Sequence, residues 1–388
     1  MTTPLRIGFI PLVDAAALLI AVDKGFTRAE HLDVELVREV SWSNVRDKLN
    51  IGLFDAAHLL APVAIASSLG LGHIKMPIVA PFNLGINGNA ITVSPALHAA
   101  IKDETEGDIV DPKATALALG RVVAGRKERG AEPLTFGMTF PFSTHNYQLR
   151  FWMAAGGVDP DEDVRLVVLP PPYMVDSLAG GQVDAFCVGA PWNSVAVDLG
   201  VGHILHFVSD ILVRAAEKVL AVRQNWSEQN RDVLAALVRA VSRGADFIER
   251  LENRSEAADM LARPDRIGVD PEVIRRTLDG RLKISPDGTA RESDRYLLLG
   301  REDAGRPDPV QAAWLYAQMV RWDQTAYSPE ALGIAMGVFR PDLFEAALGA
   351  GGTRSGSSEA IGAFTGPSFD SRDIPGHLAA FSIGRRKA

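Results

Sequence analysis

Short apolar stretches alternate with amphipathic stretches along the first part of the chain, and this pattern predicts strands that are each followed by a helix. We expect Asp14 to cap the first helix and Gly25 to end it. Such alternation is typical of an α/β lobe with a largely parallel sheet. The predicted strands are 6–12, 34–40, 55–60, 75–80 and 90–93, and the predicted helices are 14–23, one from about 41, and 62–68.

A second series of strands and helices follows. Pro191 is expected to open a helix, because proline is favoured at the first helical position, whereas the polar stretch 101–110 is expected to be a loop. Helical patterns dominate after residue 207. The predicted strands are 134–139, 164–169, 184–188 and 203–207, and the predicted helices are 112–130, 143–155, 172–179, 231–250, 255–261, 271–278 and 309–322.

The chain is therefore expected to form two α/β lobes. Lobe 1 is predicted to be discontinuous, with residues 1–93 joined to residues 208–350, and lobe 2 to consist of residues 94–207. The chain would then cross between the lobes near Val93 and again near Phe207. A tail of residues 351–388 is rich in Gly and Ser, and part of it is expected to be mobile.

Composition and charge narrow the class of protein. The 388 residues are 47% hydrophobic and 23% charged, which is ordinary for a globular protein. The formal net charge of −8 argues against a general nucleic-acid binder, and any bound anion would need a local positive site. The single cysteine, Cys187, lies in an apolar run, so we interpret it as a core residue rather than a nucleophile.

The sequence carries no P-loop, no HExxH pair and no GxSxG motif. The segment 70–72 (GLG) lacks the glycine spacing of a dinucleotide-binding turn, so we interpret it as the end of a helix. His203 and His206 are close in sequence, but strand spacing places them on opposite faces. No two histidines form the i, i+4 pair of a helical metal site. We therefore expect a binding protein without catalytic residues, cofactor or metal.

Polar donors follow predicted strands at the starts of two helices. His145 falls in the first turn of one helix, with Ser143 or Thr144 as its cap, and Trp42 occupies the corresponding place in another. Helix N-termini have unpaired N–H groups and suit small anions, and ligands of open α/β sheets lie beyond the carboxyl ends of strands. The alternative for His145 is a surface or capping residue, and for Trp42 it is packing in the core or between lobes.

Two more candidates precede predicted strands. Lys218 stands before an apolar run, and Asn89 stands before the strand 90–93. The alternative for Lys218 is a solvated surface charge, because lysine is mostly exposed. The alternative for Asn89 is a turn residue, because Asn-Gly favours turns. Trp192 and Asn193 either pack at the start of a helix or line a cleft.

Several segments, taken together, are similar to a known family over roughly residues 6–332. The chain resembles the type II solute-binding proteins of nitrate and bicarbonate ABC transporters, the NrtA/CmpA group. The resemblance implies a periplasmic-binding-protein-like fold, with two α/β lobes and an oxyanion cleft between them. The segments that carry it are 41–49, 87–93, 144–145, 154–160, 170–193, 217–220 and 321–322.

The resemblance also implies ligand contacts, which fall on Trp42, Asn89, His145 and Lys218. In this family the nitrate binders are associated with glutamine at the position of Asn89. The bicarbonate binders carry an acidic residue, used with a metal ion, where Lys218 stands here, and the nitrate binders carry lysine. Nitrate has acceptors only, so a site made of N–H donors complements it. The resemblance therefore implies nitrate or nitrite as the ligand, without a metal ion.

The chain begins with a strand pattern instead of a signal peptide, so we expect a cytoplasmic protein without membrane contact. The stretch 297–322 looks closest to the NasS-type cytoplasmic nitrate/nitrite sensors. The resemblance implies a sensor that holds a NasT-type RNA-binding antiterminator until the anion binds, without itself contacting nucleic acid. The alternatives are the substrate-binding component of a nitrate ABC transporter with its signal peptide removed, and an enzyme on the same fold, like the thiamine-pyrimidine synthases.

Overall fold

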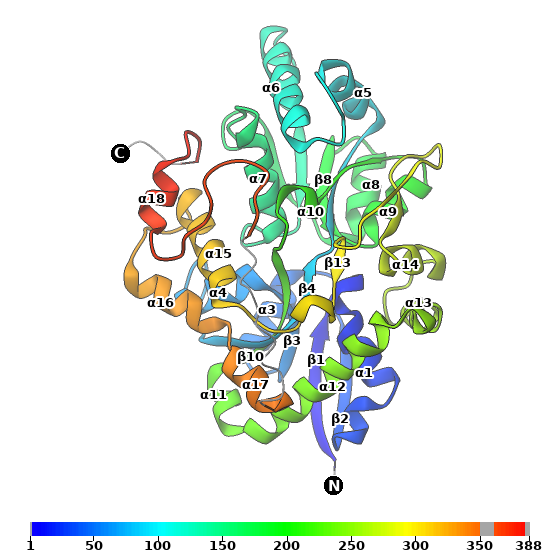
Figure 1. Cartoon of the computed structure of the whole chain (residues 1–388), viewed down its shortest axis with the longest axis vertical. Coiled ribbons are helices and arrows are strands. Elements are labelled where there is room, and N and C mark those ends of the chain that lie inside the picture. The colour runs from blue at the N-terminus through cyan, green and yellow to red at the C-terminus, as the bar shows by residue number, and fades with distance from the viewer. Residues whose placement is uncertain (1, 350–360, 385–388) are drawn as a thin grey trace.

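The computed structural model describes residues 2–349 and 361–384, and they form two α/β lobes stacked along the long axis of the molecule (Figure 1). We keep the name lobe 1 for the part built on a six-stranded sheet, and lobe 2 for the part built on a five-stranded sheet. The Gly/Ser-rich stretch 351–358 of the predicted tail lies outside the described residues.

The sheet of lobe 1 has the order β13-β4-β10-β3-β1-β2. β1 pairs in parallel with β2 and β3, whereas β10 runs antiparallel to β3 and β4. The sheet is therefore mixed rather than largely parallel. Its strands are β1 (Thr3–Phe9), β2 (Leu32–Arg38), β3 (Ala56–Leu60), β4 (Ile78–Asn87), β10 (Ala216–Arg223) and β13 (Leu297–Leu298).

The helices that accompany this sheet come from both ends of the chain. A 3₁₀ turn, η1 (Val13–Ala15), follows β1 and leads into α1 (Ala16–Asp23), and α1 packs against the long helix α12 (Arg231–Glu249). The other helices are α2 (Phe26–Ala29), α3 (Trp42–Asn50), α4 (Ala61–Leu69), α11 (Gln224–Gln229), α13 (Arg254–Leu261), α15 (Pro309–Arg321), α16 (Pro329–Val338) and α17 (Pro341–Leu348).

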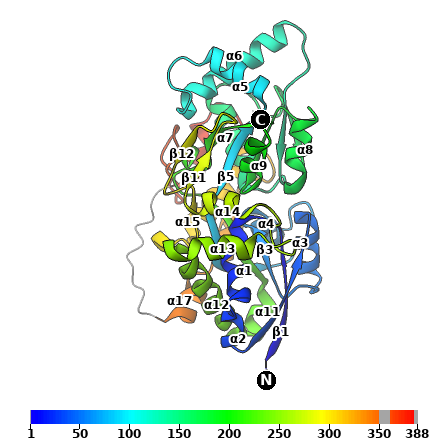
Figure 2. The ribbon, with the colours of Figure 1, turned by 90° about the vertical axis from the view of Figure 1, so that its right-hand side faces the viewer.

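The sheet of lobe 2 has the order β7-β6-β8-β5-β9. Its strands are β5 (Asn89–Val93), β6 (Thr135–Met138), β7 (Arg165–Val168), β8 (Ala185–Gly189) and β9 (His203–Phe207). Its helices are α5 (Pro95–Glu104), α6 (Pro112–Glu128), α7 (Thr144–Ala155), α8 (Met174–Ala179), α9 (Trp192–Asp198) and α10 (Val208–Ile211). A hairpin of β11 (Arg281–Lys283) and β12 (Ala290–Glu292), which follows α14 (Pro271–Leu278), lies beside this sheet (Figure 2).

Three local predictions are wrong. The stretch 101–110 is not all loop, because α5 extends to Glu104 with Ser94 as its cap and with Ile101 buried. The strand β5 belongs to the sheet of lobe 2, although the predicted boundary assigned it to lobe 1. Asp14 lies inside η1 and does not cap α1, because its carboxylate is held by other side chains. The predictions that Gly70 ends a helix and that Cys187 is buried are confirmed.

Asn87 joins the two crossings between the sheets. Its Nδ2 donates to the carbonyl oxygens of Val213 and Arg295 at 3.0 Å each, and its Oδ1 accepts from the amide of Ala215 at 3.0 Å. Asn87 and Gly88 have φ angles of 60° and 88°, in the left-handed region where Asn and Gly are best tolerated. The first crossing is therefore at Gly88, five residues before the position that the pattern predicts.

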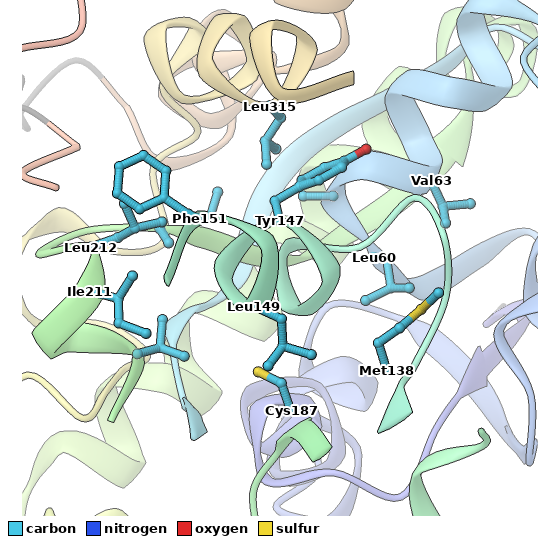
Figure 3. Close-up of a cluster of buried hydrophobic side chains, with 14 of the residues drawn as sticks. Leu60, Val63, Met138, Tyr147, Leu149, Phe151, Cys187, Ile211, Leu212 and Leu315 are labelled. Atoms are coloured by element: carbon cyan, nitrogen blue, oxygen red, sulfur yellow. The ribbon is translucent and has the colours of Figure 1, made fainter. Parts of the chain in front are cut away.

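One cluster of buried apolar side chains extends from lobe 1 into lobe 2. Leu60 and Val63 contribute from lobe 1, and Tyr147 and Leu149 contribute from α7 of lobe 2. Figure 3 shows Leu149 pointing toward Cys187 of β8, while Tyr147 lies on the side of α7 that faces α15. Because the cluster is continuous, the lobes pack against each other and shield the side chains between them.

The last described segment, residues 361–384 of the predicted tail, packs on both lobes. The amide of Phe364 donates to the carbonyl of Ile211 at the end of α10, and Arg321 of α15 donates to the carbonyl of Ile383. A short helix, α18 (Ile374–Ala379), buries Leu378 in this segment.

The contact between α12 and α1 gives a test of the packing of lobe 1. An added Cβ at Gly244 would lie 2.1 Å from the carbonyl oxygen of Ala17. We expect Gly244→Ala to lower the free energy of unfolding by about 1–3 kcal/mol in urea denaturation, because overpacking forces the helices apart. Gly333 on α16 has no atom within 4 Å of an added Cβ, so Gly333→Ala is the matched control.

The control should raise the free energy of unfolding by up to about 1 kcal/mol, since glycine is unfavourable inside a helix. Equal stability of the Gly244→Ala protein and the unmodified protein would contradict the close approach of α1 and α12.

Candidate functional site

The four candidate residues lie between the lobes, and all of them are buried. Trp42 begins α3 and Lys218 lies on β10, both in lobe 1, whereas His145 lies in the first turn of α7 and Asn89 begins β5, both in lobe 2. Trp42 is 1% exposed and the other three are 0% exposed. The interpretations of Lys218 as a surface charge and of His145 as a surface residue are therefore wrong.

Contacts join these side chains into one cluster. The ammonium of Lys218 lies 5.5 Å from the ring centroid of Trp42. It also lies 3.0 Å from Glu217 Oε2, and this oxygen is 3.5 Å from Nε2 of His145. Asn89 reaches α7 through a hydrogen bond of 3.2 Å from its Nδ2 to Oε1 of Gln148. We call these residues, together with Asp14 and His58, the interlobe cluster.

Hydrogen bonds to serine side chains fix the starts of α3 and α7. Ser41 accepts a hydrogen bond from the amide of Asn44, and Ser143 accepts one from the amide of Asn146, so each serine caps its helix. Thr144 is not the cap; its hydroxyl donates to the carbonyl of Ala216 at 3.0 Å. This bond ties the first turn of α7 in lobe 2 to β10 in lobe 1.

Lys218 is paired with two carboxylates. Its Nζ lies 2.8 Å from Asp14 Oδ2 and 3.0 Å from Glu217 Oε2. The other oxygen of Asp14, Oδ1, lies 2.8 Å from Nε2 of His58. Burial alone would lower the pKa of Lys218, but the two carboxylates outweigh burial and raise it. The ammonium is therefore charged at neutral pH.

Glu217 and Lys218 are consecutive residues of one strand, yet both side chains reach the interlobe cluster. Consecutive side chains of a regular strand point to opposite faces. The register of β10 against β4 shifts on both sides of Lys218, which pairs with Gly85 while Val219 pairs with Asn83. A β-bulge of this kind redirects a side chain.

The carboxyl groups of Asp14 and Glu217 have different surroundings, and their pKa values shift in opposite directions. Burial raises the pKa of Asp14, but Lys218 and His58 outweigh burial and hold that pKa well below its usual value. Burial dominates at Glu217 and raises its pKa to about 7. Burial and the nearby ammonium of Lys218 lower the pKa of His145, and burial lowers the pKa of His58. Both imidazoles are therefore neutral at neutral pH.

Several buried polar atoms of the interlobe cluster have no hydrogen-bond partner among the described residues. The unpaired nitrogens are Trp42 Nε1, His145 Nε2 and Gln148 Nε2. The oxygens Asn89 Oδ1 and Glu217 Oε1 are also unpaired. A buried polar group without a partner costs about 1–3 kcal/mol, and such groups call for an explanation. The arrangement is that of a polar site suited to a small ligand with hydrogen-bond acceptors.

The sequence does not reveal four members of the cluster, which are Asp14, His58, Gln148 and Glu217. Asp14 has the pattern of a helix cap, and Gln148 that of an ordinary helical residue. Glu217 adjoins Lys218, but regular strand alternation would place the two side chains on opposite faces. The expectation that the site consists only of N–H donors is therefore wrong, because it contains two carboxyl groups.

Asn193 and the two histidines that are close in sequence have structural roles. Asn193 bonds to Thr92 and to the carbonyl of Val188, so it fixes α9 against the sheet. His206 bonds to Thr115, and His203 stacks on His98 with ring centroids 4.1 Å apart. No group of three or more His, Cys, Asp or Glu residues suited to a metal ion occurs within residues 2–349 and 361–384. No helix in those two ranges has the length and apolarity needed to cross a bilayer.

The chain is similar to a known protein family and to several known proteins. The profile of the NMT1-like family matches residues 1–262. The nitrate/nitrite binding protein NrtA of Nostoc sp. is 30% identical over 351 residues, which are 89% of this chain and 77% of that protein. The nitrate import ATP-binding protein NrtC of Synechocystis sp. is 33% identical over 388 residues. This alignment covers 98% of the chain but 55% of NrtC, so the chain spans about half the length of that relative.

Solved structures agree with this relationship. The crystal structure of the periplasmic nitrate-binding protein NrtA from Synechocystis PCC 6803 matches with a TM-score of 0.88 and 26% identity, over 98% of this chain and 99% of that one. The periplasmic aliphatic sulphonate binding protein SsuA of Escherichia coli has a TM-score of 0.56 and 16% identity, over 89% of this chain and 100% of that one, so it shares the fold. The chain belongs to the NMT1-like family and, within it, to the NrtA/CmpA-type solute-binding proteins.

Proposed function

We propose that this chain binds nitrate or nitrite between its lobes, at the interlobe cluster. The observation that carries the proposal is the set of buried, unpaired nitrogens, Trp42 Nε1, His145 Nε2 and Gln148 Nε2, in the cluster around the charged ammonium of Lys218. A small anion with several acceptor oxygens would pair with these groups. Relatives that are named as nitrate/nitrite binding proteins support this choice of anion.

In this proposal each residue has a distinct role. Lys218 supplies positive charge, and Trp42 supplies an N–H donor and an apolar wall. His145 donates from Nε2, which requires that Thr139 donate to Nδ1, 3.1 Å away. Asn89 and Gln148 supply amide groups. We propose no catalytic role for any of them, because the relatives named for nitrate and nitrite are binding proteins.

Anion binding would favour the packed arrangement of the lobes. Trp42 and Lys218 belong to lobe 1, whereas His145 and Asn89 belong to lobe 2. A ligand held by both lobes binds the closed state better than an open state, so it shifts the population toward closure. A partner protein that prefers one state would then respond to the anion.

We propose further that the chain is a cytoplasmic sensor, with a NasT-type RNA-binding antiterminator as its partner. The resemblance of 297–322 to NasS-type sensors supports this role. This stretch begins with β13, where Leu297 pairs with Asn87 at the crossing between lobes. The second candidate function is the substrate-binding component of a nitrate ABC transporter, and the relatives named as nitrate import or periplasmic proteins favour it.

The choice of anion can be tested by calorimetric titration. We expect nitrate or nitrite to bind, and bicarbonate to give no binding heat with or without calcium, because Lys218 supplies the positive charge that a metal ion would otherwise provide. Tight binding of bicarbonate with calcium, together with no binding of nitrate or nitrite, would contradict the proposal.

The indole of Trp42 gives a sharper test. Trp42→Phe removes the N–H donor, which has no protein partner, so we expect nitrate affinity to fall about 10- to 100-fold, as for loss of a hydrogen bond to a charged group. Trp152→Phe is the matched control. Trp152 is also buried, but its Nε1 already donates to the carbonyl of Pro112 at 3.1 Å.

The control should keep its nitrate affinity and lose about 1 kcal/mol or more of unfolding free energy. Calorimetry and urea denaturation of both variants measure the two effects. Unchanged nitrate affinity in Trp42→Phe would place the anion elsewhere.

The sensor role predicts a complex that nitrate dissociates. The partner must prefer the anion-free state, so it should weaken nitrate binding by the same factor by which nitrate weakens the complex. Co-purification of the chain with the antiterminator, with and without nitrate, measures this coupling. A complex that is indifferent to nitrate, or the absence of a complex, would reject the sensor role and favour the transport role.

A further inference from the structure

The interlobe cluster contains a conflict of charge if it binds an anion. Asp14 and Glu217 are both buried and both lie within 3.0 Å of Lys218. If both carboxyl groups are ionised, the two negative charges exceed the single positive charge of Lys218. An anion would then add a second unbalanced negative charge to a buried region, where charges interact more strongly than at the surface.

Asp14 is not the group that can relieve this conflict. Both of its oxygens face donors, Oδ2 toward Lys218 and Oδ1 toward His58, each at 2.8 Å. Both contacts favour the ionised form of Asp14. Protonation of Asp14 would weaken each of them.

Glu217 is held differently. Its Oε2 faces Lys218 and His145, whereas its Oε1 is buried and makes no hydrogen bond of good geometry among the described residues. The side-chain amide of Asn89 also favours the ionised carboxyl, but burial outweighs it and raises the pKa. A proton on Oε1 would leave the contact between Oε2 and Lys218 in place. The protonated oxygen would become a donor beside the other unpaired donors of the site.

The other titratable groups near Glu217 leave it as the acceptor of a proton. Lys218 already carries its proton, and burial raises the pKa of Cys187 well above its usual value, so the thiol stays neutral. Burial also raises the pKa of Tyr296, so its phenol keeps its proton. Burial lowers the pKa of His145 and of His58, so neither imidazole takes up a proton near neutral pH. The groups that face Glu217 or its partners are Lys218 of β10, Asp14 of η1, His58 of β3, His145 of α7, Cys187 of β8 and Tyr296 near Asp14 and Cys187.

We propose that the anion binds together with one proton, and that Glu217 carries this proton as a neutral carboxylic acid whose Oε1–H donates to the anion. The proposal rests on the proposed function, since it concerns the same site. The proton comes from solvent, and the anion is not changed chemically. Lys218, Asp14 and protonated Glu217 sum to zero charge, so the bound anion leaves one net negative charge instead of two.

The titration of Glu217 supports the proposal. Burial raises the pKa of this carboxyl to about 7 before any anion is present. A negative ligand beside the carboxyl raises the pKa further, because like charges favour the neutral form. At a pH above the free-state pKa, binding therefore takes up a proton, and at a pH well below it the proton is already in place. Nitrate affinity should be highest in mildly acidic solution.

The test is a calorimetric titration with nitrate from about pH 6 to about pH 9, in pairs of buffers with different ionisation enthalpies. We expect the affinity to fall about tenfold per pH unit above about pH 7, and proton uptake to rise toward one per anion. In Glu217→Gln, a neutral amide replaces the carboxylic acid, so binding should persist without a pH slope and without proton uptake. An infrared difference spectrum of the unmodified protein should show a carboxylic acid band that nitrate strengthens at alkaline pH.

Glu35→Gln is the matched control, because Glu35 is exposed and pairs with Arg6 at 2.9 Å on the far strands of lobe 1. This variant should keep the pH profile of the unmodified protein. A pH-independent affinity in the unmodified protein would overturn the proposal while leaving nitrate binding intact. If the Glu217→Gln protein keeps the pH dependence of nitrate affinity, another group carries the proton. If this variant folds but does not bind nitrate, the ionised form of Glu217 is needed for binding. Either result overturns the proposal. Failure of the unmodified protein to bind nitrate or nitrite at any pH would remove the proposed function and this proposal together.

Discussion

The buried ammonium of Lys218 is the constraint on which the rest of the interlobe region depends. An isolated charge in the protein interior is unfavourable by many kcal/mol unless it is paired. Asp14 and Glu217 provide the pairing, so η1 must bring Asp14 to the middle of the sheet and β10 must bulge to turn Glu217 toward Lys218. His58 then holds the second oxygen of Asp14. The 3₁₀ turn η1 and the register shift in β10 therefore both bring carboxyl groups to Lys218.

The same region connects the lobes. Thr144 bonds across to β10, His145 approaches Glu217, and the apolar cluster around α7 extends into lobe 1. The helix α7 therefore makes both the polar contacts of the interlobe cluster and the apolar contacts that surround this cluster. A ligand bound between Trp42 and Lys218 of lobe 1 and His145 and Asn89 of lobe 2 would shift the equilibrium between packed and separated lobes, and either proposed function would use this shift.

The sequence predicts the two α/β lobes and most of their strands and helices, for identifiable physical reasons. Strand and helix periodicity is visible wherever one face is buried, and Ser41 and Ser143 mark helix starts that the structure confirms. Trp42 and His145 could be identified because they stand at those starts. Glu217 could not be identified, since its position depends on a bulge that comes from pairing with β4, far away in sequence. Lys218 looked like a surface charge from its residue type, and only family resemblance placed it at the site.

The strand order of lobe 1 affects how the protein forms during synthesis. β10 lies between β3 and β4, although it follows them in sequence by the whole of lobe 2. A ribosome that has released β1 to β4 has therefore released a sheet with a gap at its centre. The gap can be filled only after residues 89–207 have emerged and β10 follows. Because Lys218 lies on β10, the gap in the sheet of lobe 1 is filled and the interlobe cluster is completed at the same step, after lobe 2 has had time to fold, and the edge strand β13 is added later.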